Sequence, residues 1–391
     1  MEALRSLIRG DLPPVGNSII HKRNQDDIGM PEFAGYKATW VDSGTSALAL
    51  AFKAVRFLRP DLSSPEVLIP GYCCPDLLSA AHYAGIKPVL VDINDNDPSF
   101  SLTRVRDAIS KNTLAIVAIN FLGVSEDLHG LSKLKAEFPQ LYIVEDNAQW
   151  FPSSGEDDLL IGDFVTFSFG RGKPLSLLGG GLLLSKLDLP EAFIQENIEP
   201  IADSSFVSRW SVKAKLMAYN QLLNPFFYQM ISRNPFISLG NTRYSALEKI
   251  TSFDDVRREL FTANMIQYNR SSNHIGSCYD QLLSDIHFNN RFSALHTARR
   301  RRLLRYPVLF SSVEEKQRVY KVLVEAGLGA TEMYRLALPE ISGVQNYTIA
   351  GSLDNSMAFA ERFISLPVHQ AVSAVHLKLI RAAFERVNLI F

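Results

Sequence analysis

One lysine of the sequence lies in a glycine-containing loop that directly follows an apolar run. Residues 167–173 read Phe-Ser-Phe-Gly-Arg-Gly-Lys, and three glycines follow at 179–181. The amine of Lys173 can form a Schiff base with an aldehyde if it reaches the aldehyde in its deprotonated form. Most loop lysines are only solvated charges, so this motif alone leaves both interpretations open.

An acidic pair ends a second apolar run. Residues 144–149 read Val-Glu-Asp-Asn-Ala-Gln, so that Gln149 follows three positions after Asp146. A carboxylate at Asp146 can keep the pyridine nitrogen of pyridoxal phosphate protonated, which makes the ring an electron sink. Asp146 can equally cap a following helix. The motif by itself does not separate these two roles.

Hydroxyl and glycine residues precede an Ala- and Leu-rich stretch near the beginning of the chain. Residues 43–50 read Ser-Gly-Thr-Ser-Ala-Leu-Ala-Leu. The free N–H groups and the dipole at the start of such a helix can receive a phosphate. An ordinary N-cap explains the same pattern.

These motifs need elements to position them, and the sequence between about residues 37 and 186 alternates short apolar runs with helical patterns. This alternation predicts an α/β fold with a mostly parallel sheet covered on both faces. Ligands of such sheets bind outside the carboxyl ends of the strands, so polar residues just after a strand are the first candidates for a site. The predicted strands cover 65–69, 88–93, 114–119, 141–144, 163–169 and 181–184, and helices are predicted at 77–84 and 131–138.

The alternation fades after residue 186. We predict a large domain over residues 1–250, with an apolar insert at about 206–240, and a smaller α+β C-terminal domain over 251–391. The smaller domain rests on one long amphipathic helix over 253–285, a strand at 306–310 and helices at 313–326 and 373–387.

Taken together and in this order, the three motifs resemble those of the DegT/DnrJ/EryC1/StrS family of pyridoxal-phosphate-dependent sugar aminotransferases. Two further segments are similar to family motifs. Residues 240–245 resemble Gly-x-Asn-x-Arg-Met-Ser with one spacer missing, and residues 362–369 resemble Arg-x-Leu-Ser-Leu-Pro-x-His. The resemblance runs from about residue 37 to 387 and implies fold type I, the aspartate-aminotransferase-like fold, for the large domain.

The resemblance also implies roles for individual residues. Lys173 becomes the catalytic Schiff-base lysine that also moves the proton, Asp146 the partner of the pyridine nitrogen, and Gln149 a neighbour of the cofactor's phenolic oxygen. Active sites of the family lie at a dimer interface, so the resemblance implies a homodimer. The implied phosphate-binding residues are Gly44, Thr45, Ser46 and Ser168, with Asn241, and Arg243 as a second candidate, from the neighbouring subunit. The implied substrate contacts are Asn120, Arg243 and Tyr334.

Three positions depart from the family pattern. Cys74 occupies the place where the family has an aromatic residue stacked on the cofactor; a thiol can contact a π system but buries less area. Gly180 stands where the family has a carboxylate, and Asn120 where it has a histidine. The latter two positions often face the substrate in the family, so the departures bear more on the substrate than on the cofactor.

The segment from Trp210 to Leu239 is unusually rich in large apolar residues. Subunit-interface or core packing is its commonest explanation. The alternative is an apolar surface for a lipid-linked substrate or a peripheral membrane contact, with Lys213, Lys215 and Arg233 at its margins. The arginine run at 299–302 is typical of a solvated face, and a substrate diphosphate is its alternative role.

Composition narrows the classes of partner. The chain has 391 residues with 40 Lys and Arg against 41 Asp and Glu, so its net charge of -1 gives no reason to expect a nucleic-acid partner. Three cysteines without CxxC or HxxxH spacing predict neither a disulfide framework nor a metal site. No apolar run approaches the roughly 18–20 residues that span a bilayer, and no secretory signal is evident. We expect a soluble, cytoplasmic protein.

The expected function is an aminotransferase that moves an amino group from glutamate or glutamine to a keto sugar, nucleotide-linked by analogy with the family, in polysaccharide or secondary-metabolite biosynthesis. A relative that dehydrates its substrate is disfavoured, because the family's dehydratase branch has histidine in place of the lysine at 173. The remaining alternatives are a non-sugar or lipid-linked acceptor and a non-catalytic protein that binds pyridoxal phosphate for regulation.

Overall fold

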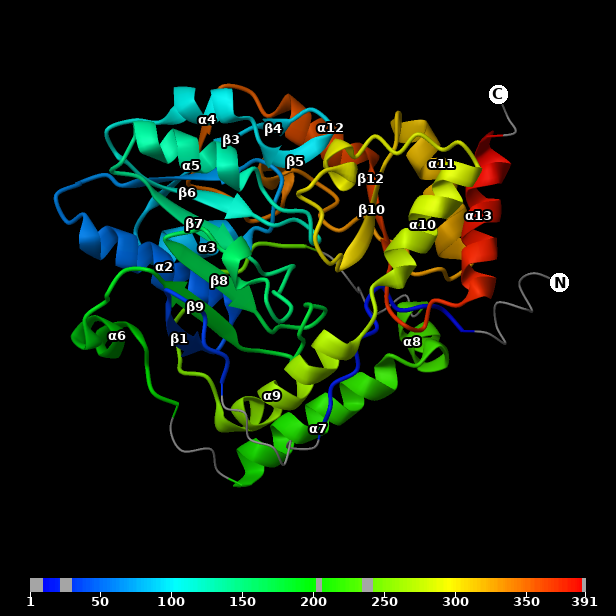
Figure 1. The fold of residues 1–391 in the computed structure, drawn as a ribbon, viewed down its shortest axis with the longest axis horizontal. Helices are drawn as coiled ribbons and strands as arrows, with labels where there is room; N and C mark the ends of the chain where they lie inside the picture. The colour runs from blue at the N-terminus through cyan, green and yellow to red at the C-terminus, as the bar shows by residue number, and fades with distance from the viewer. Residues whose placement is uncertain (1–9, 22–29, 202–205, 234–241, 389–391) are drawn as a thin grey trace.

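The computed structural model describes residues 10–21, 30–201, 206–233 and 242–388. Its centre is an eight-stranded sheet in which β9 alone runs antiparallel to its neighbours (Figure 1). This confirms the predicted α/β fold with a mostly parallel sheet. The strands, in their order across the sheet, are β1 (Lys37–Val41), β9 (Gly181–Ser185), β8 (Phe164–Ser168), β7 (Tyr142–Asp146), β6 (Thr113–Ile119), β2 (Glu66–Pro70), β3 (Lys87–Val91) and β11 (Thr348–Ala350).

Helices cover both faces of this sheet because successive strand residues point to opposite sides. On β2, Val67 and Ile69 pack in the cluster that contains α2 (Gly44–Leu58) and α3 (Asp76–Tyr83). Leu68, between them, packs with α4 (Leu102–Ala108) and α5 (Leu128–Glu137) on the other face. Strands buried on both faces read as continuous apolar runs, which is why the sequence located β2, β3, β6, β7, β8 and β9 within two residues.

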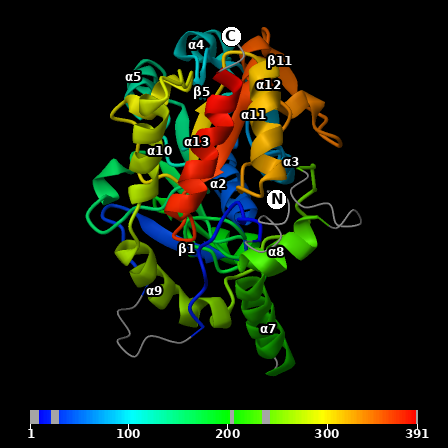
Figure 2. The same cartoon turned by 90° about the vertical axis from the view of Figure 1, so that its right-hand side faces the viewer.

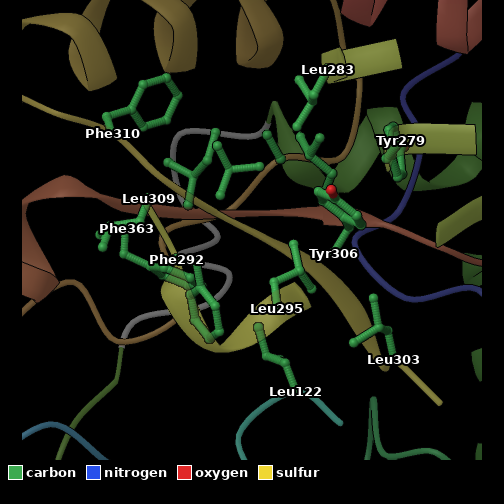
Figure 3. Packing of buried hydrophobic residues seen from close by; sticks show 14 of the residues in the cluster. Leu122, Tyr279, Leu283, Phe292, Leu295, Leu303, Tyr306, Leu309, Phe310 and Phe363 are labelled. Atoms are coloured by element: carbon green, nitrogen blue, oxygen red, sulfur yellow. The ribbon is translucent and has the colours of Figure 1, made fainter. Parts of the chain in front are cut away.

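The C-terminal part builds a second core around a two-stranded antiparallel sheet of β10 (Arg305–Leu309) and β12 (Phe363–Pro367). Figure 3 shows Phe292, Leu309 and Phe363 packed within this cluster. The helices of this part are α9 (Asp255–Arg270), α10 (His274–Asp285), α11 (Val313–Glu325), α12 (Asp354–Arg362) and α13 (Ala374–Asn388).

The single helix predicted over 253–285 is wrong, because α9 and α10 are separate helices. The chain leaves the helix at Ser271, whose hydroxyl donates to the carbonyl oxygen of Tyr268 at 2.8 Å. The hydroxyl of Ser272 then accepts from the N–H of His274 at 3.2 Å. Serine side chains that bond nearby backbone groups compete with helical hydrogen bonds, and the apolar periodicity on either side hides the interruption.

The predicted division at residue 250 stays a prediction, and the main sheet itself crosses it. Strand β11 belongs to the C-terminal part of the chain but pairs in parallel with β3 at the edge of the main sheet. The connection after β3 forms a small hairpin of β4 (Ile93–Asn94) and β5 (Asp97–Phe100).

Between β9 and α9 the chain forms α6 (Glu191–Asn197), α7 (Phe206–Leu222) and α8 (Pro225–Ser232). Helix α7 lies beside α9 and extends away from the body of the molecule (Figures 1 and 2). Within the described ranges, no helix combines the length and apolar character needed to cross a membrane.

Candidate active site

The carboxyl ends of three neighbouring strands meet at the edge of the sheet that faces the start of α2. Ile119 at the end of β6 is aligned with Asp146 at the end of β7, which is aligned with Thr166 on β8. Ser168 ends β8 beside them. A cavity opens at this edge, and its lining residues are Gly44, Thr45, Leu48, Cys73, Cys74, Asp76, Leu77, Ile119, Phe121, Asp146, Ala148, Gln149, Ser168, Lys173 and Tyr334.

Asp146 is a buried carboxylate that the chain itself leaves without a bonded cation. Its Oδ1 accepts from the N–H of Ala148 at 2.9 Å, and no ion pair to it occurs within the described residues. Burial raises the pKa of the Asp146 carboxyl, while the Ala148 N–H and the nearby charge of Lys173 oppose that rise. No helix follows Asp146, because residues 147–150 form a turn. The helix-cap interpretation is therefore wrong, and the carboxylate is available to a cationic group in the cavity.

Lys173 reaches the same cavity from the loop after β8. Its backbone N–H bonds the carbonyl oxygen of Gly170 at 3.3 Å, which turns the chain back toward the strand ends. Its side chain is partly buried at the cavity wall. The structure thus brings Lys173 and Asp146 together, although 27 residues separate them in the sequence.

Gln149 is held on both sides of its amide. Its Oε1 accepts from the N–H of Leu122 at 2.9 Å, and its Nε2 donates to the hydroxyl of Tyr334 at 2.8 Å. Burial raises the pKa of the Tyr334 phenol well above its ordinary value, so this hydroxyl is protonated at neutral pH. Both side chains line the cavity.

The start of α2 closes another side of the cavity. Ser43 caps this helix by accepting from the N–H of Ser46 at 3.0 Å, and Gly44 and Thr45 of its first turn line the cavity together with Ser168. The Gly44 backbone lies so close to Ser168 that a β-carbon at Gly44 would stand 2.5 Å from the Cβ of Ser168. Thr45 lines the cavity and its hydroxyl donates to Asp76 at 3.2 Å.

Not every residue implied by the resemblance reaches the cavity. Ser46 is fully buried, and its hydroxyl pairs with that of Ser43 at 2.8 Å. Asn120 is fully buried beneath the strand ends, where it donates to Glu145 at 3.1 Å and to Asn147. The cavity is lined instead by its neighbours, Ile119 and Phe121.

Two of the implied residues lie in the segment that leads to the C-terminal part. Arg243 is exposed and does not line the cavity, and Asn241 lies outside the described residues. Their implied contact with a neighbouring subunit stays a prediction.

Cys74 does line the cavity, at the position where the family has an aromatic residue. Burial and the charge of Asp76 raise the pKa of its thiol to about 12, so it is a neutral, apolar neighbour rather than a nucleophile. Asp76, at the first position of α3, is a cavity residue that the sequence motifs did not reveal. The position of Asp76 directly after Pro75, at the start of a helix, was the sequence signal that could have pointed to it.

The arginine run at 299–302 is not a solvated face, because all four side chains are partly buried and engaged by the protein; its alternative role toward a substrate diphosphate stays a prediction. Arg299 pairs with Asp97, and Arg300 pairs with Asp280 at 2.8 Å. The guanidinium of Arg301 stacks on Trp150, 4.2 Å from the ring centroid. Arg302 donates to the carbonyl oxygen of Tyr268 at 2.6 Å. Arg299 and Arg301 thus tie the C-terminal part to β5 and to the loop after β7, while Arg300 and Arg302 bond α10 and α9 within that part.

The residues of the cavity fit pyridoxal phosphate. The uncompensated carboxylate of Asp146 suits a protonated pyridine nitrogen, and the amine of Lys173 suits an aldehyde. Gly44 leaves the start of α2 open beside the Ser168 hydroxyl, which suits a phosphate. No group of His, Cys, Asp and Glu within the described ranges could hold a metal ion.

Comparison with known proteins gives the same family as the motifs. The sequence profile of the DegT/DnrJ/EryC1/StrS aminotransferase family matches residues 30–194 and 263–385. The GDP-perosamine synthase of Vibrio cholerae is 30% identical over 154 residues, which are 39% of this chain and 41% of that protein. A UDP-N-acetyl-3-dehydro-alpha-D-glucosamine 3-aminotransferase of Acidithiobacillus ferrooxidans is 31% identical over 37% of this chain and 39% of that protein. These matches therefore span about two fifths of the relatives' length.

Solved structures extend the likeness over most of the chain. A DegT DnrJ EryC1 StrS aminotransferase from Brucella abortus superposes with a TM-score of 0.64 and 17% identity, covering 90% of this chain and 86% of that one. A putative sugar aminotransferase from Streptococcus pneumoniae in its PLP form has a TM-score of 0.64 and 20% identity, covering 90% and 87%. At these identities the likeness shows the fold alone, and it confirms the aspartate-aminotransferase-like fold expected from the motifs.

Proposed function

The chain belongs to the DegT/DnrJ/EryC1/StrS aminotransferase family, and we propose that it is a pyridoxal-phosphate-dependent aminotransferase that moves an amino group from glutamate or glutamine to a keto sugar. The observation that carries this proposal is that Lys173 and the buried carboxylate of Asp146, which forms no ion pair among the described residues, line the same cavity. The names of the relatives support the acceptor class, because they include enzymes of GDP-, UDP- and dTDP-linked amino sugars.

Each side chain of the cavity has a distinct task in this reaction. When bound, pyridoxal phosphate supplies the aldehyde and an electron-withdrawing ring. Asp146 would accept a hydrogen bond from the ring nitrogen and keep that nitrogen protonated, because among the described residues its carboxylate forms no ion pair. The Nζ of Lys173, at the wall of the same cavity, would take up and release the proton that the transfer of an amino group requires.

The remaining residues hold the group in place. The Ser168 hydroxyl, the Thr45 hydroxyl and the first N–H groups of α2 bind the phosphate. Gln149, fixed by Leu122 and Tyr334, lies against the cofactor's edge. We propose further that the protein is a homodimer in which Asn241 and Arg243 complete the phosphate site of the neighbouring subunit.

Borohydride reduction followed by peptide mapping tests the anchor. The protein loaded with pyridoxal phosphate should carry the reduced cofactor on Lys173, and Lys173→Ala should carry none. An adduct on another lysine would overturn the assignment.

A half-reaction with glutamate or glutamine tests turnover. An aminotransferase loses the visible absorbance of its bound cofactor when the donor is added, and recovers it when a keto sugar acceptor follows. A protein that binds the cofactor only for regulation keeps its absorbance unchanged in both steps. Acceptors linked to GDP, UDP and dTDP, compared with a keto acid that carries no sugar, then identify the substrate class.

A further inference from the structure

Helix α7 has two apolar sides, and among the described residues one side packs into a core cluster while the other is largely exposed. Leu216 and Tyr219 are buried in the core cluster that also contains Leu175 and Leu177 of the lysine loop. Val212 and Leu223 pack against the same cluster. At about 100° per residue these positions fall on one side of the helix. This side attaches α7 to the body of the molecule beside the loop that carries Lys173.

The opposite side of α7 presents a second apolar stripe to solvent. Trp210 is 54% exposed, Met217 46% and Leu222 39%, and Ala214 and Ala218 between them are exposed as well. Two lysines border this stripe, because Lys213 and Lys215 lie roughly 100° to either side of its centre on the helical wheel. An apolar stripe between two lysines is the pattern of a helix that lies in the interface of a bilayer.

Three more large apolar side chains are exposed on the next helix, α8. Phe226 is 55% exposed, Phe227 44% and Met230 63%. The rings of Phe226 and Phe227 contact each other edge to face, with centroids 5.7 Å apart. Six of the large apolar residues exposed in the described part of the chain therefore lie within α7 and α8, which Figure 2 shows at one end of the molecule.

The charge of this segment has a single sign. Residues 206–233 contain Arg209, Lys213, Lys215 and Arg233 and no Asp or Glu, a net charge of +4. Since the whole chain has a net charge of -1, the rest of it carries -5. Arg209 pairs with Glu259, and Arg233 pairs with Asp11. No ion pair in the described ranges involves the other two cations, Lys213 and Lys215, so these are available to an outside anion.

The two helices also lie outside the part that the family profile matches, since residues 195–262 fall between its two matched segments. The exposed apolar surface thus lies in a part of the chain that the family profile does not match. The catalytic residues named above, apart from Asn241 and Arg243, all lie in the matched segments.

We propose that α7 and α8 bind the surface of an anionic phospholipid bilayer. Trp210, Met217 and the exposed residues of α8 enter the boundary between headgroups and acyl chains, and Lys213 and Lys215 contact lipid phosphates. A second copy of this chain is a poorer occupant. Two-fold packing of this face on itself would bring four lysines together with no acidic residue of 206–233 to neutralise them.

Vesicle sedimentation tests this proposal with the full-length protein loaded with pyridoxal phosphate. The protein should bind vesicles of phosphatidylcholine with about one-third phosphatidylglycerol at least tenfold more tightly than pure phosphatidylcholine. Raising the salt to roughly 0.5 M should weaken the binding, because it screens the lysines. Equal binding to the two lipids, or no binding to either, would overturn the proposal.

Matched variants distinguish vesicle binding by α7 and α8 from non-specific adsorption to vesicles. Met217→Gln/Met230→Gln should lose about tenfold or more in vesicle affinity, whereas Val324→Gln/Val375→Gln, which alters valines 48% and 54% exposed on α11 and α13, should bind like the parent. Lys213→Gln/Lys215→Gln should lose affinity for anionic vesicles by a similar factor. Lys111→Gln/Lys133→Gln should not, because it removes the same charge from exposed lysines just after α4 and on α5, two helices that Figure 1 shows far from α7.

Two further readouts exclude other occupants. Trp210 is the most exposed tryptophan of the chain, so anionic vesicles should shift its fluorescence to the blue, and Trp210→Phe should lose the shift while still sedimenting with vesicles. Sedimentation velocity should give Met217→Gln/Met230→Gln the same assembly size as the parent. A smaller assembly would show instead that a second copy covers this face and would overturn the membrane proposal.

Discussion

The amide of Gln149 donates to the hydroxyl of Tyr334 at 2.8 Å, and this bond joins the turn after β7 to the C-terminal part of the chain within the candidate site. Because the hydroxyl of Tyr334 accepts from Gln149 and burial raises the pKa of this phenol, its own proton is available to a further acceptor in the cavity. Both residues line the cavity, so the bond fixes one wall of the cofactor site from two distant parts of the sequence.

Tyr334→Phe removes the acceptor of this buried amide. We expect the free energy of unfolding to fall by about 1–3 kcal/mol. Turnover should fall by about tenfold, because the amide of Gln149 is no longer held in place by the Tyr334 hydroxyl. Urea denaturation and the glutamate half-reaction measure the two effects. Tyr279→Phe is the matched control, since it removes an equally buried hydroxyl that donates to Pro367 at 3.0 Å. It should lose comparable stability and keep its turnover; equal losses of turnover in the two variants would make Tyr334 a purely structural residue.

Gly44→Ala should damage the cofactor site, because the new β-carbon would stand 2.5 Å from the Cβ and 2.7 Å from the Oγ of Ser168. Overpacking of this kind costs about 1–3 kcal/mol, and the displaced Ser168 hydroxyl should weaken binding of pyridoxal phosphate by about tenfold or more. Equilibrium dialysis of the cofactor measures the loss. Gly170→Ala meets the same serine at 3.4 Å, which is ordinary contact, and should bind the cofactor within a few-fold of the parent. The idea fails if the two alanine variants bind equally well.

The sequence predicted the sheet well for a physical reason. Its inner strands are buried on both faces, and such strands show as continuous apolar runs that end at polar residues. Asp146 and Ser168 could be placed at strand ends for the same reason, because the carboxyl end of a parallel strand is where the apolar run stops.

The rest of the site could not be predicted, because it depends on where neighbouring side chains point. In the sequence, Asn120 comes directly after β6 just as Asp146 ends β7, so both are equally good candidates for the site. The side chain of Asn120 is instead hydrogen-bonded to Glu145 and Asn147. Ile119 and Phe121 line the cavity in its place. Tyr334 comes from the C-terminal part, and only the resemblance to the family pointed to it.

The thiol of Cys74 should react slowly at neutral pH. Burial and Asp76 raise the pKa of this thiol to about 12, so its thiolate fraction below that value grows about tenfold for each pH unit. Iodoacetamide labelling between roughly pH 7 and 9, followed by peptide mass spectrometry, should therefore show a rate at Cys74 that keeps rising. Cys278, which lies outside the site, provides the internal reference. A rate at Cys74 that levels off near the ordinary thiol pKa of about 8.5 would contradict the inferred environment.

Asp146→Asn should stabilise the cofactor-free protein and disable the enzyme. Burial raises the pKa of the native carboxyl, so between the unfolded value of about 3.9 and the higher native value the folded state binds more protons. The free energy of unfolding therefore falls as the pH rises through this window, and the folded protein still carries this cost at neutral pH. Asparagine removes the charge, so the urea midpoint of the Asp146→Asn variant should exceed that of the parent at neutral pH. In acid the two midpoints should approach each other. Asp163→Asn, which breaks an ion pair with Lys135, should lower the midpoint.

With pyridoxal phosphate bound, Asp146→Asn loses a charge-assisted bond of about 1.5–3 kcal/mol to the ring nitrogen, so the glutamate half-reaction should slow at least about tenfold. A variant that is less stable than the parent without cofactor, or that turns over within about twofold of it with cofactor, would show that Asp146 serves the fold rather than the ring.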